Sequence, residues 1–178
     1  MPIRYDERMK SLFHEYYFSD ADTLNDVVVD EYRRALQSGN VRKTHLFSGR
    51  YENIYIDRER IPGLSPLITF WISSAAQVLQ IDTDRLRCGF WFNEMRPGDV
   101  TLPHSHDDDD EWLSGAYYLK VPTDSGNLIL HTKDSRTSIT PEPGKLVLFS
   151  SSSVHEVEKN GSQETRLSVG INFGAIDG

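Results

Sequence analysis

The sequence predicts a single domain of the α+β class, mainly β, in which helices come first and a sandwich or barrel of antiparallel strands follows. The chain has 178 residues, the usual length of about one domain. Apolar residues recur at helical spacing in two segments of the first half, and short β-rich runs separated by turns fill the second half. We therefore expect residues 1–84 to form a helical support region with one or more added strands, and residues 85–174 to form the core.

Two amphipathic helices are expected in the first half. In residues 20–37 the apolar side chains recur every three or four positions, and Ser19 or Asp20 is placed to cap the start. The segment 65–81 has the same period, with Pro66 near the first turn, where a missing N–H is tolerated. We expect both helices to act as packing supports.

Strand signals occur once between these helices and repeatedly after Thr83. Residues 50–57 alternate in the manner of a strand. After Thr83 about eight β-rich runs follow one another, separated by turns such as Pro97-Gly98 and Asn160-Gly161. This spacing favours antiparallel strands over an alternating parallel α/β sheet. The expected strands are 86–94, 100–104, 112–121, 127–132, 138–140, 145–150, 154–158 and 165–173.

Charge and cysteine content indicate which classes of partner and which cellular compartment to expect. With 27 acidic and 19 basic residues the formal net charge is -8, which repels phosphate backbones and anionic lipids. We therefore expect small-molecule or protein partners, and neither nucleic acid nor a membrane. The single cysteine, Cys88, cannot form an internal disulfide, residues 1–10 lack the apolar stretch of a secretory signal, and no later segment reaches the length of a bilayer span. These features predict a cytoplasmic protein, and the sequence leaves its oligomeric state open.

Three histidines form the most informative group of polar residues. His104 and His106 are two positions apart at the end of an expected strand, so their side chains project to the same side, and His155 begins a later strand. Imidazole nitrogen suits iron, zinc, copper or nickel. The alternative is that these are simply polar residues at strand ends. The acidic run 107–111 is typical of a solvated turn, although His106 and Asp108 could instead provide the first ligand pair.

Five segments, taken in order, resemble the iron(II)/2-oxoglutarate-dependent oxygenases, in the branch that includes prolyl-hydroxylase-like and small bacterial or phage hydroxylases. They are "RPGDVTLPHSH", "LSGAYYL", "SGNLILH", "PEPGKLVLFSSSSVHEV" and "RLSVGINF", and they extend over roughly residues 86–173. The resemblance implies a double-stranded β-helix, or jelly roll, as the catalytic core. It also implies a dioxygenase that uses iron(II), 2-oxoglutarate and O2, and that hydroxylates a C–H bond of a small molecule or peptide side chain.

The resemblance also implies a metal-ligand set. Carried over to this chain, the ligands of iron(II) are His104, His106 and His155. The second position commonly holds an aspartate in the family, so His106 departs from the usual pattern. Three ligands on one face of the ion leave further positions open for cosubstrate and oxygen.

The resemblance places the cosubstrate against the last strand. Arg166 corresponds to the arginine that receives the distal carboxylate of 2-oxoglutarate, and a planar guanidinium can make two parallel hydrogen bonds to that group. Ser168 is two residues on, on the same side of the strand, and can add a hydroxyl donor. The alternative for Arg166 is a surface ion pair with Glu158 or Glu164.

Two further residues are candidates for the pocket. Tyr118, the second tyrosine of "LSGAYYL", matches a position that contacts 2-oxoglutarate in prolyl-hydroxylase-like members, although tyrosines in strands are more often packing residues. Asn93 precedes the metal strand and is either a pocket residue or a turn cap. His131 and the two histidines of the first half, His14 and His45, are most simply structural or surface residues.

Part of the same pattern resembles the cupins, whose metal is bound by three histidines and a glutamate. The spacing of His104, His106 and Glu111 follows the first cupin motif, whereas Pro143-Gly144 lies too far before His155 for the second. The alternatives are thus a cupin-type metal-binding protein or a non-2-oxoglutarate dioxygenase with this ligand set, and a metal or ligand sensor without turnover. Cupins are also jelly rolls, so the expected fold is the same.

Overall fold

The computed structural model describes residues 11–106 and 110–176 and confirms a mainly β fold with helices near the N-terminus. The elements are, in chain order, β1 (Phe13–Tyr17), α1 (Ala21–Ser38), β2 (Arg42–Phe47), β3 (Arg50–Tyr55), the 3-10 turn η2 (Arg58–Arg60), α2 (Leu64–Leu79), the 3-10 turn η3 (Thr83–Arg85), β4 (Leu86–Met95), β5 (Thr101–His104), β6 (Glu111–Lys120), β7 (Leu128–His131), β8 (Arg136–Ile139), β9 (Lys145–Ser150), β10 (His155–Val157) and β11 (Arg166–Ala175).

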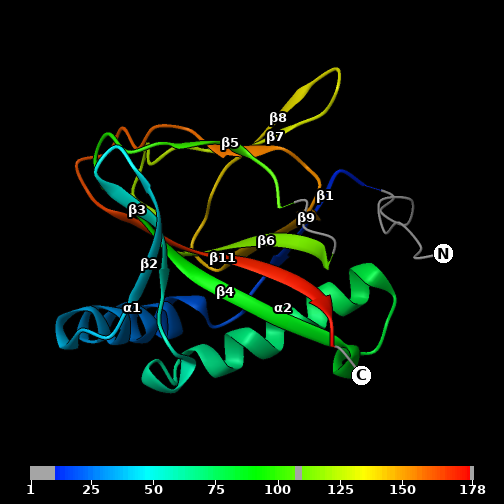
Figure 1. Cartoon of the computed structure of the whole chain (residues 1–178), viewed down its shortest axis with the longest axis horizontal. Coiled ribbons are helices and arrows are strands. Elements are labelled where there is room, and N and C mark those ends of the chain that lie inside the picture. The colour runs from blue at the N-terminus through cyan, green and yellow to red at the C-terminus, as the bar shows by residue number, and fades with distance from the viewer. Residues whose placement is uncertain (1–10, 107–109, 177–178) are drawn as a thin grey trace.

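The strands form two antiparallel sheets, which face one another as a jelly roll. A seven-stranded sheet has the order β1-β9-β6-β11-β4-β3-β2, and a four-stranded sheet has the order β5-β10-β7-β8. Figure 1 shows the smaller sheet above the larger one, with the β7–β8 hairpin projecting from it. From β4 onward the chain passes back and forth between the two sheets, which is the expected double-stranded β-helix.

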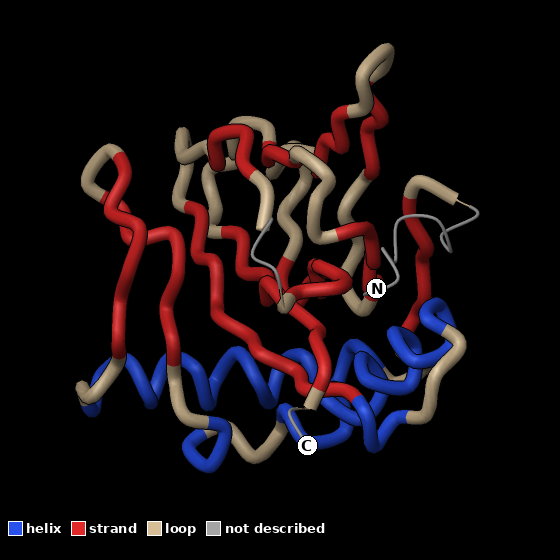
Figure 2. Tube along the Cα trace, turned by 45° about the vertical axis from the view of Figure 1, so that its right-hand side comes forward, coloured by secondary structure: helices blue, strands red, loops and turns tan. Residues whose placement is uncertain are grey.

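The helices cover the outer face of the larger sheet, as Figure 2 shows. Because successive side chains of a strand point to opposite faces, β6 contributes to two apolar clusters. Tyr117 packs in the cluster that includes Trp71 of α2, whereas Tyr118 packs in the cluster between the sheets with Leu130 and Phe149. The centre of the larger sheet is therefore buried on both faces. Neither of the described helices is long and apolar enough to cross a bilayer.

The expected elements agree with the structure, with boundaries that shift by about two residues or less. Both helices and all strands expected after Thr83 are present, as is the strand at residues 50–57. The strands β1 and β2 were not individually expected, and they carry His14 and His45. The two strands lie at opposite edges of the larger sheet. In β2, His45 has a positive φ of 58°, which interrupts the simple alternation that sequence patterns rely on.

Candidate metal centre

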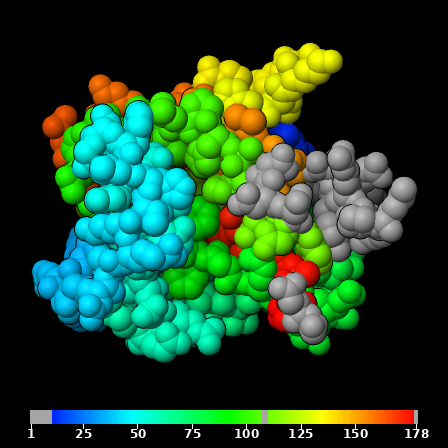
Figure 3. Space-filling view, viewed as in Figure 1, coloured from blue at the N-terminus to red at the C-terminus, as the bar shows by residue number. Residues whose placement is uncertain are grey.

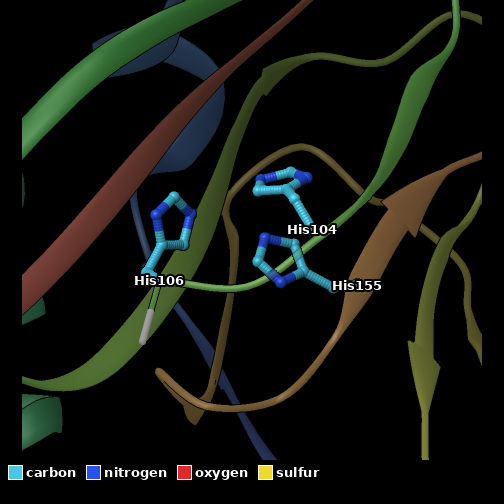
Figure 4. Close-up of side chains that lie close together, drawn as sticks. All are labelled: His104, His106 and His155. Atoms are coloured by element: carbon cyan, nitrogen blue, oxygen red, sulfur yellow. The ribbon is translucent and has the colours of Figure 1, made fainter. Parts of the chain in front are cut away.

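Three histidine side chains lie together at one end of the space between the sheets. His104 ends β5 and His155 begins β10, and these two residues are direct partners in the antiparallel pairing of the strands. Their ring centres are 4.3 Å apart, and the His106 ring lies 5.1 Å from His104 and 5.2 Å from His155. Figure 4 shows the three rings gathered around one point. One nitrogen from each ring lies within 4.8 Å of the others, so the group could hold one metal ion.

Backbone carbonyls orient two of these rings. His104 Nδ1 lies 2.8 Å from the Leu102 carbonyl oxygen, and His155 Nδ1 lies 3.0 Å from that of Ser153. Because a carbonyl oxygen only accepts hydrogen bonds, each Nδ1 carries a hydrogen, and in the neutral form of such a ring the lone pair lies on Nε2. This is the usual arrangement of a metal-binding histidine whose other nitrogen is held by the protein.

Burial keeps His155 in the form that binds metals. The side chain is enclosed, and this burial lowers its pKa to about 3; the neighbouring His104 acts in the same direction, and the Ser153 carbonyl opposes both. The imidazole is therefore neutral near pH 7, and a neutral imidazole can donate its lone pair to a metal.

The histidines open into a cavity of about 350 Å³ between the sheets. Seven candidate residues from the resemblance to the oxygenases line it, namely His104, His106, His155, Arg166, Ser168, Tyr118 and Asn93. Ser168 is the direct partner of Asn93 on β4 and of Tyr118 on β6, so these three side chains form a row across the larger sheet. The three histidines thus lie at one end of the cavity, and polar side chains line the side that the larger sheet forms.

Arg166 is buried, with 1% of its surface exposed. Its Nη1 donates hydrogen bonds to the carbonyl oxygens of Ser125 and Gly126, and its guanidinium carbon lies 5.2 Å from the centre of the Tyr118 ring. The arginine is held by carbonyl oxygens and an aromatic face.

The surface ion pair considered for Arg166 does not form. Glu164 pairs instead with Lys120 at 2.9 Å, and the Glu158 carboxylate accepts a hydrogen bond from the Asn127 backbone N–H. No carboxylate of the described residues forms an ion pair with Arg166, so its positive charge is available to a ligand.

Unsatisfied polar atoms cluster around this arginine. Arg166 Nε, the Tyr118 hydroxyl and Ser125 Oγ are buried and have no hydrogen-bond partner among the described residues. Burial also lowers the pKa of Arg166 and raises that of Tyr118. A buried polar group without a partner costs about 1–3 kcal/mol, so these atoms fit a ligand that brings acceptor oxygens, such as a carboxylate.

Asn93 is held by an arginine that sequence reasoning missed. Arg50 is 7% exposed and donates from Nη1 to Asn93 Oδ1 at 3.0 Å, and from Nη2 to Glu52 at 2.9 Å and to the Val100 carbonyl oxygen at 2.8 Å. Since guanidinium nitrogens only donate, Asn93 must turn its oxygen toward Arg50, and its amide nitrogen remains for the cavity. Asn93 is therefore a cavity residue and not a turn cap.

Two aromatic side chains near the histidines also line the cavity and were not predicted from the sequence. His45 lines the cavity from the β2–β3 hairpin, and Trp91 lines it from β4, with its ring centre 5.4 Å from that of His106. Figure 3 shows the hairpin, in cyan, lying against the green surface of the following strands. His45 has an unusual positive φ, but a backbone angle cannot be read from the sequence, so the sequence did not mark this residue.

Glu111 does not join the three histidines. Its carboxylate pairs with Arg87 at 3.1 Å, and it is not among the residues that line the cavity. The described structure thus does not assemble the four-ligand set of the cupin alternative. Asp108, the other possible ligand, lies outside the described residues. His131 lies away from the cavity and contacts Glu156 at 3.0 Å.

Comparison with known proteins identifies a family that matches the segment containing the three histidines. Residues 90–174 match the family model of the 2OG-Fe(II) oxygenase superfamily. Among solved structures, a Pseudomonas putida prolyl-4-hydroxylase is 20% identical with a TM-score of 0.65, and the match covers 98% of this chain and 93% of that one. A Trichoplax adhaerens prolyl hydroxylase, solved with a hypoxia inducible factor peptide fragment, is 19% identical with a TM-score of 0.68, covering 97% and 87%.

Other similar structures are named for different reactions. The alpha-ketoglutarate-dependent carbocyclase SnoK from nogalamycin biosynthesis is 15% identical with a TM-score of 0.75, covering 99% of this chain and 85% of that one. No curated protein matches the chain. The fold therefore agrees across enzymes whose reactions differ. The matched segment contains the three histidines and the buried arginine, and through residues 90–174 the chain belongs to the 2OG-Fe(II) oxygenase superfamily, with iron(II) and 2-oxoglutarate as its cofactor and cosubstrate.

Proposed function

We propose that this protein is an iron(II)- and 2-oxoglutarate-dependent dioxygenase that hydroxylates a C–H bond of a small molecule or a peptide side chain. The observation that carries the proposal is the meeting, in one cavity of about 350 Å³, of three histidines and a buried arginine surrounded by unsatisfied polar atoms. We place the protein in the cytoplasm and take residues 1–178 as one domain, with residues 1–84 as support and 85–174 as the catalytic core.

His104, His106 and His155 are the proposed ligands of iron(II). Two of them present Nε2 because a carbonyl holds Nδ1, and their separation suits a single ion. Bound iron(II) and 2-oxoglutarate together supply the power to activate O2 and oxidise a C–H bond, with 2-oxoglutarate converted to succinate and carbon dioxide. The protein supplies orientation and exclusion of water.

Arg166, Ser168 and Tyr118 are the proposed residues for the distal carboxylate of 2-oxoglutarate. Arg166 keeps Nε unsatisfied, and Tyr118 keeps its hydroxyl unsatisfied, so both can donate to a carboxylate without breaking an existing bond. Ser168 lies directly opposite Tyr118 and can add its hydroxyl. Three neutral imidazole ligands do not offset the positive charge of iron(II). The dianionic cosubstrate should therefore strengthen the binding of the metal as well.

Asn93 is the proposed contact for the substrate. Arg50 fixes its oxygen, so the amide N–H groups can donate to an acceptor on the substrate. A carbonyl or hydroxyl oxygen near the oxidised carbon would satisfy them. The net charge of -8 favours a neutral or cationic substrate over nucleic acid.

Formation of succinate tests the proposal. Purified protein given iron(II), 2-oxoglutarate and O2 should release succinate, and the His155→Ala variant should not. His131→Ala is the matched control, because His131 lies outside the cavity and should leave the yield unchanged. Binding of iron(II) and 2-oxoglutarate without succinate, even with candidate small molecules and peptides added, would favour the sensor alternative instead.

A further inference from the structure

We infer that Glu52 is a specificity-determining residue, which binds a cationic amine of the substrate beside the oxygen acceptor that Asn93 contacts. The inference rests on the proposed function, because it names the class of substrate that the same cavity accepts. It concerns the wall of the cavity that β3 and β4 form, and not the residues proposed for the metal and 2-oxoglutarate.

The described residues that line the cavity include one carboxylate and one guanidinium. These belong to Glu52 and Arg166. In the larger sheet, β3, which carries Glu52, lies beside β4 on the side away from β11, which carries Arg166. The proposed function assigns Arg166 to the distal carboxylate of 2-oxoglutarate. The carboxylate of Glu52 is therefore left to face the substrate.

One guanidinium holds Glu52 and Asn93 as neighbours. Arg50 donates from Nη2 to Glu52 Oε1 at 2.9 Å and from Nη1 to Asn93 Oδ1 at 3.0 Å. Arg50 is buried and is not among the residues that line the cavity, whereas Glu52 and Asn93 both line it. Because the two nitrogens belong to one rigid, planar group, the wall presents an acceptor carboxylate next to a donor amide.

Arg50 does not cancel the negative charge beside it. Its guanidinium also lies 3.6 Å from Asp99, so one positive charge faces two carboxylates. The Glu52 side chain is 18% exposed, and among the described residues its second oxygen accepts no hydrogen bond. A protonated amine supplies both the donor and the positive charge that this carboxylate lacks.

Two further cavity residues suit the same ligand. Asn53 lines the cavity and donates from Nδ2 to the Tyr55 hydroxyl at 3.2 Å, which leaves Asn53 Oδ1 as another acceptor for an ammonium group. Trp91 lines the cavity from β4, and aromatic faces attract cations. A substrate with a carboxylate at this position would instead be repelled by Glu52.

A pair of isosteric probes tests the inference by binding, without turnover. Nα-acetyl-ornithine N-methylamide ends in an ammonium group, and Nα-acetyl-norleucine N-methylamide has a methyl group in the same place. Both carry amide oxygens for Asn93. In calorimetric titrations the wild-type protein should bind the ornithine probe about 10-fold more tightly or better, because its hydrogen bond to Glu52 is charge-assisted. Glu52→Gln keeps the shape of the side chain and an acceptor for Arg50, and it should bind the two probes about equally.

Two control variants separate a contact with the substrate from an effect on the fold. Asp99→Asn also removes a carboxylate from Arg50, but Asp99 does not line the cavity, so this variant should keep most of the preference. Glu164→Gln changes an exposed carboxylate that pairs with Lys120, and it should keep all of it. Equal losses in Glu52→Gln and Asp99→Asn would overturn the inference. So would equal binding of the two probes, or binding of neither, by the wild-type protein.

Failure of the inference and failure of the proposed function give different results. Succinate formation by a wild-type protein that does not prefer the ornithine probe would overturn the role of Glu52 alone. A preference that depends on Glu52, in a protein that forms no succinate with the ornithine probe or any other candidate substrate, would support the amine site and contradict the proposed dioxygenase.

Discussion

The guanidinium carbon of Arg166 lies 5.2 Å from the centre of the Tyr118 ring, and each residue of this pair has a buried polar atom without a partner among the described residues. The two side chains come from neighbouring strands, β11 and β6, whose pairing sets their separation. Leaving such atoms unsatisfied costs folding free energy, and a bound carboxylate recovers it. The pair is therefore organised for a ligand before the ligand arrives.

Tyr118→Phe tests this organisation directly. Removing the unsatisfied hydroxyl should leave the metal-free protein as stable as the wild type or more stable, by up to about 1–3 kcal/mol, while weakening 2-oxoglutarate binding. Urea unfolding and a 2-oxoglutarate titration measure the two effects.

Tyr117→Phe is the matched control. The Tyr117 hydroxyl donates to Asn25 Oδ1 at 2.9 Å, on the helix side of the same strand. This variant should lose about 0.5–1.5 kcal/mol of stability and bind 2-oxoglutarate normally. The opposite pattern in the two variants would contradict the assignment of Tyr118.

His155 should make the stability of the metal-free protein sensitive to mild acid. Burial lowers its pKa to about 3, whereas in the unfolded chain it titrates near 6.5. Between these pH values the unfolded chain binds more protons than the folded one, so the free energy of unfolding falls as the pH is lowered, by at most about 1.4 kcal/mol per pH unit. Urea unfolding at pH 7 and pH 5.5 should show a steeper decline in the wild type than in His155→Gln. Equal declines would mean that His155 is not held neutral by the fold.

Arg50 should be important for stability. It is buried and bonded to Asn93, Glu52 and backbone carbonyls, so Arg50→Ala leaves several polar groups without a partner. We expect a loss of about 2–4 kcal/mol in the free energy of unfolding, somewhat below the cost for a fully buried pair because Glu52 is partly exposed. Arg33→Ala, which removes an exposed pair with Asp30, should cost about 0.5 kcal/mol or less. Similar losses in the two variants would show that the Arg50 contacts carry little energy.

Glu111→Ala should retain the metal. The Glu111 carboxylate contacts Arg87, away from the three histidines, so its removal should leave metal content unchanged while His104→Ala lowers it. Metal analysis of the purified variants gives the answer. If the Glu111→Ala protein folded but contained no metal, the result would support Glu111 as a ligand, as in the cupin alternative.

The sequence contains much of the fold in local patterns. Helical periodicity located α1 and α2, alternation located β3, and β-rich runs bounded by turn residues located the strands from β4 to β11, because these signals depend only on neighbouring residues. Ser114, Ala116 and Tyr118 occupy alternate positions of β6, and all three line the cavity.

The residues that sequence reasoning missed depend on register between strands. Trp91 lies against Gly170, and Arg50 reaches Asn93, only because β4 pairs with β11 on one side and lies beside β3 on the other. Nothing in the local sequence of either strand encodes that pairing. Glu111 seemed well spaced for a metal, but its partner Arg87 comes from β4, which a spacing motif does not contain.

The most direct test of the account is the binding of iron(II) and 2-oxoglutarate to one site. Anaerobic addition of both to the purified protein should produce a weak visible metal-to-ligand charge-transfer band, because 2-oxoglutarate must coordinate the ion for the band to appear. The band should be absent in His155→Ala and should require more 2-oxoglutarate in Arg166→Lys, since a lysine cannot reproduce the planar fork of the guanidinium. Absence of the band in the folded wild-type protein at saturating iron(II) and 2-oxoglutarate would contradict the central claim that the three histidines and Arg166 form one catalytic centre.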